Sequence, residues 1–164
     1  GRNTFYDIAL EQRWKDILPG VYNDGILSVC GDNYGIDTLK GWEWMIGKNC
    51  LIIAYFCWGD FVYVSFDKKK VYLMISQEAE QISLGDNLES VFDYNFSTDK
   101  FYSTIMLCEK FNKCRELHGD LKYNQCYIPN PWICLGGEDI LENYKIRNFS
   151  IYVDLIGQHW EANF

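Results

Sequence analysis

The segment CYIPNPWICLGGEDILENYKIRNFSIYVDLIGQHW, residues 126–160, indicates how the chain completes its fold. It opens with an apolar run that contains Pro129 and Pro131. Proline fixes φ and has no N–H, so this run is expected to be an extended or sheet-edge segment rather than a central strand. The pair Gly136-Gly137 then permits a sharp turn, because glycine adopts backbone angles that other residues avoid.

The same segment ends in a pattern that is typical of an amphipathic helix. Asn148 is a candidate N-cap, because its side-chain oxygen can accept a hydrogen bond from the first helical turn. Several later residues recur at helical spacing and are expected to share one buried face: Ile151, Tyr152, Leu155, Ile156 and either His159 or Trp160. We therefore predict that an amphipathic C-terminal helix packs against the rest of the fold.

Upstream, apolar and β-branched runs follow one another closely and indicate neighbouring strands. The runs are residues 51–58, 61–66 and 71–76, with shorter candidates at residues 82–84 and 26–30. Gly59-Asp60 and residues 67–70 make short connections between the first three runs, which favours an antiparallel meander because parallel strands need long crossovers. The sequence thus predicts an α+β fold in which a meander of about four to five strands packs with helices.

Helical patterns precede and follow this meander. A first helix is expected over residues 4–18, before Pro19-Gly20. Two more are expected, one beginning near Asp86 and one over residues 97–118. Residues 36–46 fit either a short helix or an irregular aromatic patch.

The length and composition favour a globular, acidic chain. Its 164 residues are expected to form a single domain, with a helix and an irregular segment over residues 1–48 and the core over residues 49–164. Fifteen basic and 23 acidic residues give a net charge of −8, which disfavours binding to nucleic acid and favours a basic partner. No apolar run is long enough to cross a bilayer, so no membrane association is expected. Seven irregularly spaced cysteines indicate free thiols in a reducing compartment, the cytoplasm.

Few residues are suited to catalysis or to metal binding. The two histidines are His118 and His159, and no cysteine stands in a recognisable nucleophile motif. The candidate metal ligands are Cys108, Cys114, His118 and Cys126, which lack the paired C-x-x-C spacing of a tetrahedral site. We therefore predict no catalytic residue, no metal and no cofactor.

Two motifs resemble a known bacterial family. The first comprises Pro131, Leu135-Gly136-Gly137, Glu138 and Glu142-Asn143, followed by the amphipathic helix, and the second is the aromatic-Gly-Asp turn Trp58-Gly59-Asp60-Phe61. Both are similar to motifs of the C-terminal domain of type VI secretion DNase-immunity proteins, which often accompanies a GAD-like segment. Ile128 departs from the pattern, since the family often has glycine there, and the double proline is unusual.

The resemblance implies an immunity protein, which is a cytoplasmic, non-enzymatic binder that blocks a secreted toxin without covalent chemistry. The toxin would be a type VI effector nuclease with a basic domain. Acidic and aromatic residues near the glycine turn are the candidate contacts with this partner: Glu138, Asp139, Glu142, Trp132 and Tyr144. If Trp58 and Leu135 are buried, alanine at either position should lower stability.

Two alternatives remain open from the sequence. One is a binding protein of the SMI1/KNR4-like superfamily, which also combines helices with an antiparallel sheet. The other is an enzyme or small-ligand-binding domain with a cleft beside Gly136-Gly137, where Cys134, His159 and a carboxylate could converge.

Overall fold

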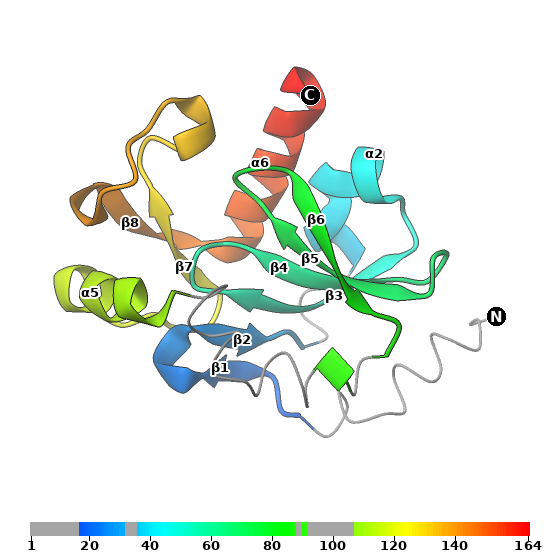
Figure 1. The fold of residues 1–164 in the computed structure, drawn as a ribbon, viewed down its shortest axis with the longest axis horizontal. Coiled ribbons are helices and arrows are strands. Elements are labelled where there is room, and N and C mark those ends of the chain that lie inside the picture. Colours follow the sequence, from blue (N-terminus) through cyan, green and yellow to red (C-terminus); the bar gives the residue numbers. More distant parts are fainter. Residues whose placement is uncertain (1–16, 32–35, 88–89, 92–106) are drawn as a thin grey trace.

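A computed structural model describes residues 17–31, 36–87, 90–91 and 107–164 (Figure 1). Within these residues, six antiparallel strands form one sheet in the order of the sequence. They are β1 (Gly20–Tyr22), β2 (Leu27–Val29), β3 (Cys50–Phe56), β4 (Phe61–Ser65), β5 (Lys70–Ile75) and β6 (Glu80–Gly85). A second antiparallel sheet pairs β7 (Gln125–Pro129) with β8 (Tyr144–Asn148).

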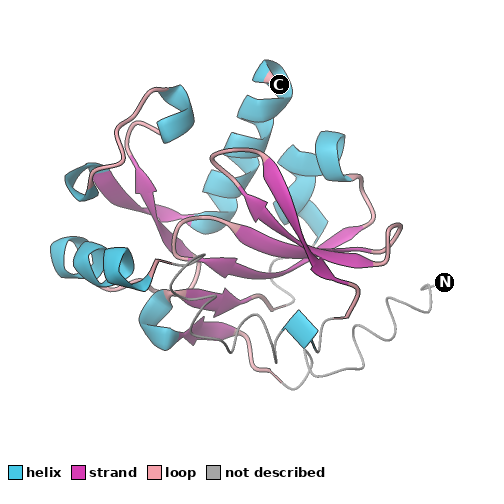
Figure 2. Ribbon diagram, viewed as in Figure 1, coloured by secondary structure: helices cyan, strands magenta, loops and turns pink. Residues whose placement is uncertain are grey.

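Helices surround the larger sheet (Figure 2). The longest described one, α6 (Phe149–Asn163), packs beside η4 (Ile36–Trp42), a 3-10 helix that leads into α2 (Glu43–Ile46). On another side, α5 (Cys108–His118) packs against β8. Short 3-10 turns complete the elements: η2 (Asn23–Gly25), η6 (Ile133–Leu135) and η7 (Leu141–Asn143).

The predicted α+β class is confirmed, and residues 36–46 are helical. The C-terminal part of the helix predicted over residues 97–118 is present as α5, whereas the helix predicted over residues 4–18 lies outside the described residues. The helix expected after Asp86 also falls largely outside them.

The estimate of four to five strands was too low. The described residues contain eight strands. The short candidate at residues 26–30 is present as β2, whereas β1 was not predicted because its three residues are too few to show a clear period. The extended segment expected through residue 135 ends at Pro129, and a 3-10 turn follows at Ile133–Leu135. Its partner strand, β8, was missed because it lies within a stretch rich in charged residues.

Both faces of the sheet are buried along β3 and β4, which explains why these central strands are almost wholly apolar. Along β4, Phe61 and Tyr63 belong to one hydrophobic cluster, and Val62 and Val64 belong to the other. The first cluster is covered by η4 and α6, and the second includes residues of α5, β7 and β8. A register shift between Ile52 and Ala54 marks an irregularity in the pairing of β3 with β4.

Helix α6 begins at its predicted cap. The Asn148 side chain accepts a hydrogen bond from the Ile151 N–H at 3.0 Å. The predicted buried face is partly wrong, because Ile151 and Leu155 are 60% and 49% exposed. The helix instead buries Phe149, Tyr152, Val153, Ile156 and Gly157. Its apolar residues occupy more than one side of the helix, so their spacing alone does not show which side is buried.

Glycines bring the backbones of α6 and η4 into contact. A Cβ on Gly41 would lie 2.3 Å from the Asp154 carbonyl oxygen, and a Cβ on Gly157 would lie 2.6 Å from Gly41. At this crossing the Trp42 Nε1 donates to the Val153 carbonyl at 2.9 Å. This hydrogen bond satisfies the indole N–H of a side chain that has no exposed surface.

The Trp58-Gly59-Asp60 turn between β3 and β4 contacts both α6 and β7. Gly59 has a φ of +84°, and a Cβ there would lie 2.4 Å from Tyr152 of α6 and 2.8 Å from Ile128 of β7. Just before it, the Tyr127 N–H donates to the Cys57 carbonyl at 2.7 Å, which ties β7 to the same turn. Only glycine fits here without displacing either neighbour.

We predict that Gly59→Ala destabilises the protein more than Gly47→Ala. Gly47 has a nearly identical φ of +86°, but a Cβ at this position would meet nothing within 4 Å, so both changes add backbone strain and only Gly59→Ala adds overpacking. The difference in unfolding free energy should be about 1–3 kcal/mol, measured by urea denaturation. Equal losses for the two variants would show that the contact with Tyr152 and Ile128 relaxes freely.

Candidate functional site

The Asp60 carboxyl group lies at the centre of a polar network inside the fold. Its Oδ1 accepts hydrogen bonds from the Ser76 N–H at 2.9 Å and from the Ser76 Oγ at 3.3 Å. The Ser76 hydroxyl is also 2.8 Å from the Tyr152 hydroxyl, which accepts a hydrogen bond from Gln77 Nε2 at 2.9 Å. The network joins the β3–β4 turn, the β5–β6 turn and α6.

Burial raises the pKa of the Asp60 carboxyl to about 7. The two hydrogen bonds from Ser76 act in the opposite direction, and nearby Glu78 raises the pKa further. A carboxyl with this environment is protonated more readily in the folded than in the unfolded chain. Asp60 is therefore a titratable part of the internal structure.

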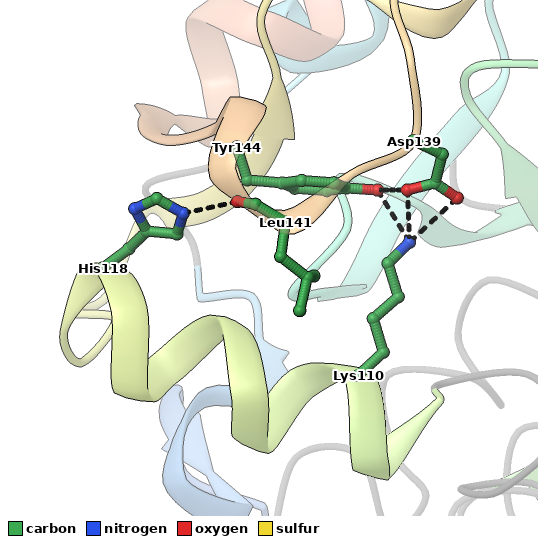
Figure 3. A network of polar contacts seen from close by, with 5 residues as sticks. All are labelled: Lys110, His118, Asp139, Leu141 and Tyr144. Carbon is green, nitrogen blue, oxygen red and sulfur yellow. Dashed lines mark hydrogen bonds and ion pairs between the residues drawn. The ribbon is translucent and has the colours of Figure 1, made fainter.

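A second polar cluster joins α5 to the loop before β8 (Figure 3). The Lys110 Nζ lies 2.9 Å from Asp139 Oδ1 and donates to the Tyr144 hydroxyl at 2.7 Å. The same ammonium group lies 4.6 Å from the ring centroid of Trp58 and 4.8 Å from that of Tyr144. At the other end of α5, the His118 Nε2 is 2.7 Å from the Leu141 carbonyl oxygen.

This arrangement alters the chemistry of its carboxylate and phenol. Partial burial acts to raise the pKa of Asp139, but hydrogen bonds from Tyr144 and Lys110 outweigh it and lower that pKa below its usual value. Burial and the neighbouring Asp139 carboxylate raise the pKa of Tyr144, so its hydroxyl stays protonated and donates to Asp139. Lys110, which the sequence did not single out, thus links α5 to this loop together with His118.

The predicted partner-binding residues are not equivalent in the structure. Glu138 and Glu142 are exposed, and no ion pair joins either of them to another described residue. Asp139 is 52% exposed but already pairs with Lys110. Tyr144 is 3% exposed, and the expectation that its ring could contact a partner is corrected because that ring packs in the core beside Trp58.

Trp132 remains available at the surface. Its ring is partly exposed and meets the rings of Tyr152 and His159 edge-on, at centroid distances of 5.7 Å and 6.1 Å. His159 in turn contacts Trp160, whose Nε1 donates to the Ser76 carbonyl at 2.9 Å. These contacts orient Trp132 and place the partly exposed His159 ring between the rings of Trp132 and Trp160.

In the Gly136-Gly137 turn, the backbone of Pro131 and Trp132 packs closely against Gly137 and leaves no room for a side chain there. The Gly137 N–H donates to the Trp132 carbonyl at 2.9 Å, and a Cβ on Gly137 would lie 2.0 Å from the Pro131 carbonyl oxygen. Gly136 has a φ of +94° and faces open space. Leu135, the hydrophobic residue of the motif, is 57% exposed, so alanine there should cost little stability.

Shallow grooves flank the exposed side of α6. Trp132, Arg147 and Tyr152 line one groove together with Ile151 and Leu155, and Asp37, Thr38 and Ser150 line the other together with Asp154 and the same two apolar residues. Ile151 and Leu155 therefore form a ridge between two depressions. The sequence placed both side chains in the core, so this surface was not predicted.

The surroundings of four cysteines favour the protonated thiol. Burial raises the pKa of the Cys57, Cys114 and Cys126 thiols, and partial burial raises that of Cys134, which favours the less reactive protonated form. Among the described residues, no group of three or more histidine, cysteine, aspartate or glutamate side chains could hold a metal ion. A search of the same residues finds no helix with the length and apolar character needed to span a bilayer.

Comparison with known families identifies the second half of the chain. Residues 86–159 match the family described as T6SS immunity protein Tdi1, C-terminal. This segment is similar to that family, and the matched residues make up less than half of the chain. The resemblance inferred from Pro131, Leu135-Gly136-Gly137 and the C-terminal helix is therefore confirmed. The Trp58-Gly59-Asp60-Phe61 turn lies before the matched residues, although it contacts β7 and α6 inside them.

The fold also has a counterpart among solved structures. The crystal structure of Atu4351 from Agrobacterium tumefaciens superimposes with a TM-score of 0.64 at 13% sequence identity. The similarity covers 85% of this chain and 70% of the other one, and at this identity it establishes the fold alone. A search among curated proteins gives no significant match.

We predict that Asp60→Asn removes a pH-dependent destabilisation from the folded protein. The folded pKa of about 7 exceeds the ordinary aspartate value of about 3.9, so the stabilising contribution of protonated Asp60 is complete below pH 4 and is lost as the pH rises through 7. Asparagine keeps an oxygen acceptor for Ser76 without the charge. The unfolding free energy of the variant relative to the wild type should grow by about 1–3 kcal/mol between pH 4 and pH 8, and parallel pH profiles would contradict this assignment.

A second prediction concerns the polar cluster around Lys110 that joins α5 to the loop before β8. Lys110→Met keeps the aliphatic stem but removes the charge that Asp139, Tyr144 and Trp58 contact, and it should lower stability by about 1–2 kcal/mol. Lys113→Met, at an exposed position on the same helix, is the control and should change stability by less than about 0.5 kcal/mol. Urea denaturation of both variants measures the difference. Similar values for the two would mean that the Lys110 cluster adds nothing to stability.

Proposed function

We propose that this protein is an immunity protein that binds and neutralises a toxin delivered by a type VI secretion system. The observation that carries the proposal is the match of residues 86–159 to a family of type VI immunity proteins. The raised pKa values of the Cys57 and Cys134 thiols support a role in binding rather than catalysis, because a protonated thiol is a poor nucleophile. The proposed action is a non-covalent block of the toxin within the cytoplasm of the producing cell.

The partner is proposed to be a nuclease with a basic surface. The net charge of −8 supports this, because an acidic inhibitor and a basic nucleic-acid-binding cleft attract each other and associate quickly. An acidic protein can occupy the place of the phosphate backbone without any chemistry of its own. The acidic residues that remain unpaired at the surface, rather than those in internal ion pairs, are the ones suited to this contact.

Glu138 and Glu142 are the proposed acidic contacts, with Trp132 as the neighbouring aromatic one. The two glutamates are exposed and flank Asp139, whose own carboxylate is engaged by Lys110. Asp139 therefore supports the shape of the loop. Reversing its charge would place two cations together at Lys110, so a test of binding should leave this residue unchanged.

The proposal is tested by producing the toxin candidate encoded beside this protein's own gene, with and without the protein. A toxin gene is sought there because a cell that carries the toxin survives only if it also carries the antidote. Rescue of growth and co-purification of a stable complex are the expected results. Continued growth arrest in the presence of soluble, folded protein, with no complex, would reject that toxin as the partner.

We predict that the double variant Glu138→Lys/Glu142→Lys binds this toxin at least about tenfold more weakly, chiefly through slower association that depends less on salt. Its melting temperature should stay close to that of the wild type because both side chains are exposed. The double variant Glu109→Lys/Glu116→Lys on α5 changes the net charge equally and is the control. Surface plasmon resonance measures the affinity and association rate of both variants. Equal weakening would mean that the overall charge, rather than a contact at Glu138 and Glu142, causes the loss.

A further inference from the structure

The exposed face of α6 presents an apolar ridge. Ile151 and Leu155 are four residues apart, so their side chains lie one turn apart on the same side of the helix, and they are 60% and 49% exposed. The buried side of the same helix carries Phe149, Tyr152, Val153 and Ile156. The helix is thus apolar on two sides, although packing inside the fold uses only one of them.

The ridge is bordered by depressions on both sides. Figure 1 shows α6 between the loop that joins β7 to β8 and the η4–α2 segment. The groove toward the loop is lined by Trp132 and Arg147, and the groove toward η4 is lined by Asp37 and Asp154. A central ridge between two grooves is the relief into which the side chains of another helix pack.

Two more apolar side chains, which follow Trp132 closely in the sequence, are exposed. Ile133, in the turn that follows Trp132, is 39% exposed, and Leu135 is 57% exposed. Trp132 itself is oriented by Tyr152 and His159 and is prearranged as a contact residue. Grouped apolar exposure of this kind, with a fixed tryptophan in it, is typical of protein interfaces.

The charges beside the ridge favour a basic partner. Asp37 is exposed, and no ion pair joins it to another described residue. Asp154 accepts a hydrogen bond from Gln158 Nε2 at 2.8 Å but also lacks a cationic partner within the described part of the chain. A second copy of this chain would bring another net charge of −8 to the same face, which disfavours self-association.

From this geometry we propose that the Ile151–Leu155 ridge of α6 is a docking surface for an amphipathic helix of the toxin. That helix carries apolar side chains at three- and four-residue spacing, which straddle the ridge and contact Trp132. Its lysine or arginine side chains lie along the Asp37 and Asp154 side. This inference rests on the proposed function and adds to the Glu138 and Glu142 contacts a second, largely apolar one.

The test compares Ile151→Arg and Leu155→Arg with the matched control Leu117→Arg. Leu117 is an apolar residue of α5 that is 54% exposed, so each substitution places the same charge on an exposed helical position. Binding of the catalytically inactivated toxin encoded beside this protein's own gene is measured by calorimetry. Each α6 variant should raise the Kd at least about thirtyfold, the control less than about threefold, and all melting temperatures should stay near the wild-type value.

The outcomes separate this inference from the function on which it rests. If the wild type binds and protects cells while both α6 variants bind as tightly as Leu117→Arg, the docking surface is wrong and the proposed function stands. If the wild type neither binds nor protects, both are rejected for this toxin. A free wild-type protein that is dimeric in light scattering, and that Ile151→Arg renders monomeric, would assign the ridge to a second copy instead.

A charge variant tests the basic character of the toxin helix independently. Asp154→Lys should weaken binding about tenfold and remove part of the salt dependence, whereas Asp154→Asn should have a smaller effect. Hydrogen exchange of the complex should show slower exchange in α6 and in residues 132–135 than in the free protein. Unchanged exchange in both segments, in a complex that forms normally, would overturn the proposed surface.

Discussion

The close contact between the Gly59 turn and Tyr152 is the constraint on which the rest of the structure depends. The absence of a side chain at Gly59 lets α6 approach the end of β3, and the Tyr127–Cys57 hydrogen bond adds β7 at the same point. The Asp60 carboxyl then reaches Ser76, whose hydroxyl meets the Tyr152 hydroxyl. Four elements from distant parts of the chain can meet in this small region because Gly59 has no side chain to keep them apart.

This junction also explains how the family segment relates to what precedes it. Residues 86–159 include β7, β8 and most of α6, which supply surfaces to both hydrophobic clusters. The described residues of this segment contain no part of the six-stranded sheet. Their buried side chains need the sheet as a partner, since Cys126 and Ile128 pack in one cluster and Tyr127 in the other. The family segment and the preceding sheet therefore form one continuous core in the described residues.

The surface residues divide according to whether the fold already uses them. Asp139 and Tyr144 are held by Lys110, and this cluster links α5 to the loop before β8. Glu138, Glu142 and Trp132 remain accessible, as do Ile151 and Leu155. A binding protein can keep its polar clusters for internal alignment and leave unpaired acidic and apolar groups for the partner, because a charge that is already paired offers a partner little additional energy.

The sequence by itself determined the α+β class, the apolar core strands, the tight Gly59 turn, the Asn148 cap and the resemblance of the second half to an immunity family. These features depend on local chemistry: strand composition, glycine conformations, side-chain capping and short motifs. Only the tertiary structure decided that Ile151 and Leu155 face outward, that Tyr144 is buried and that Lys110 engages Asp139. Spacing shows that residues share a side of a helix, but which side is buried depends on partners that lie far away in the sequence.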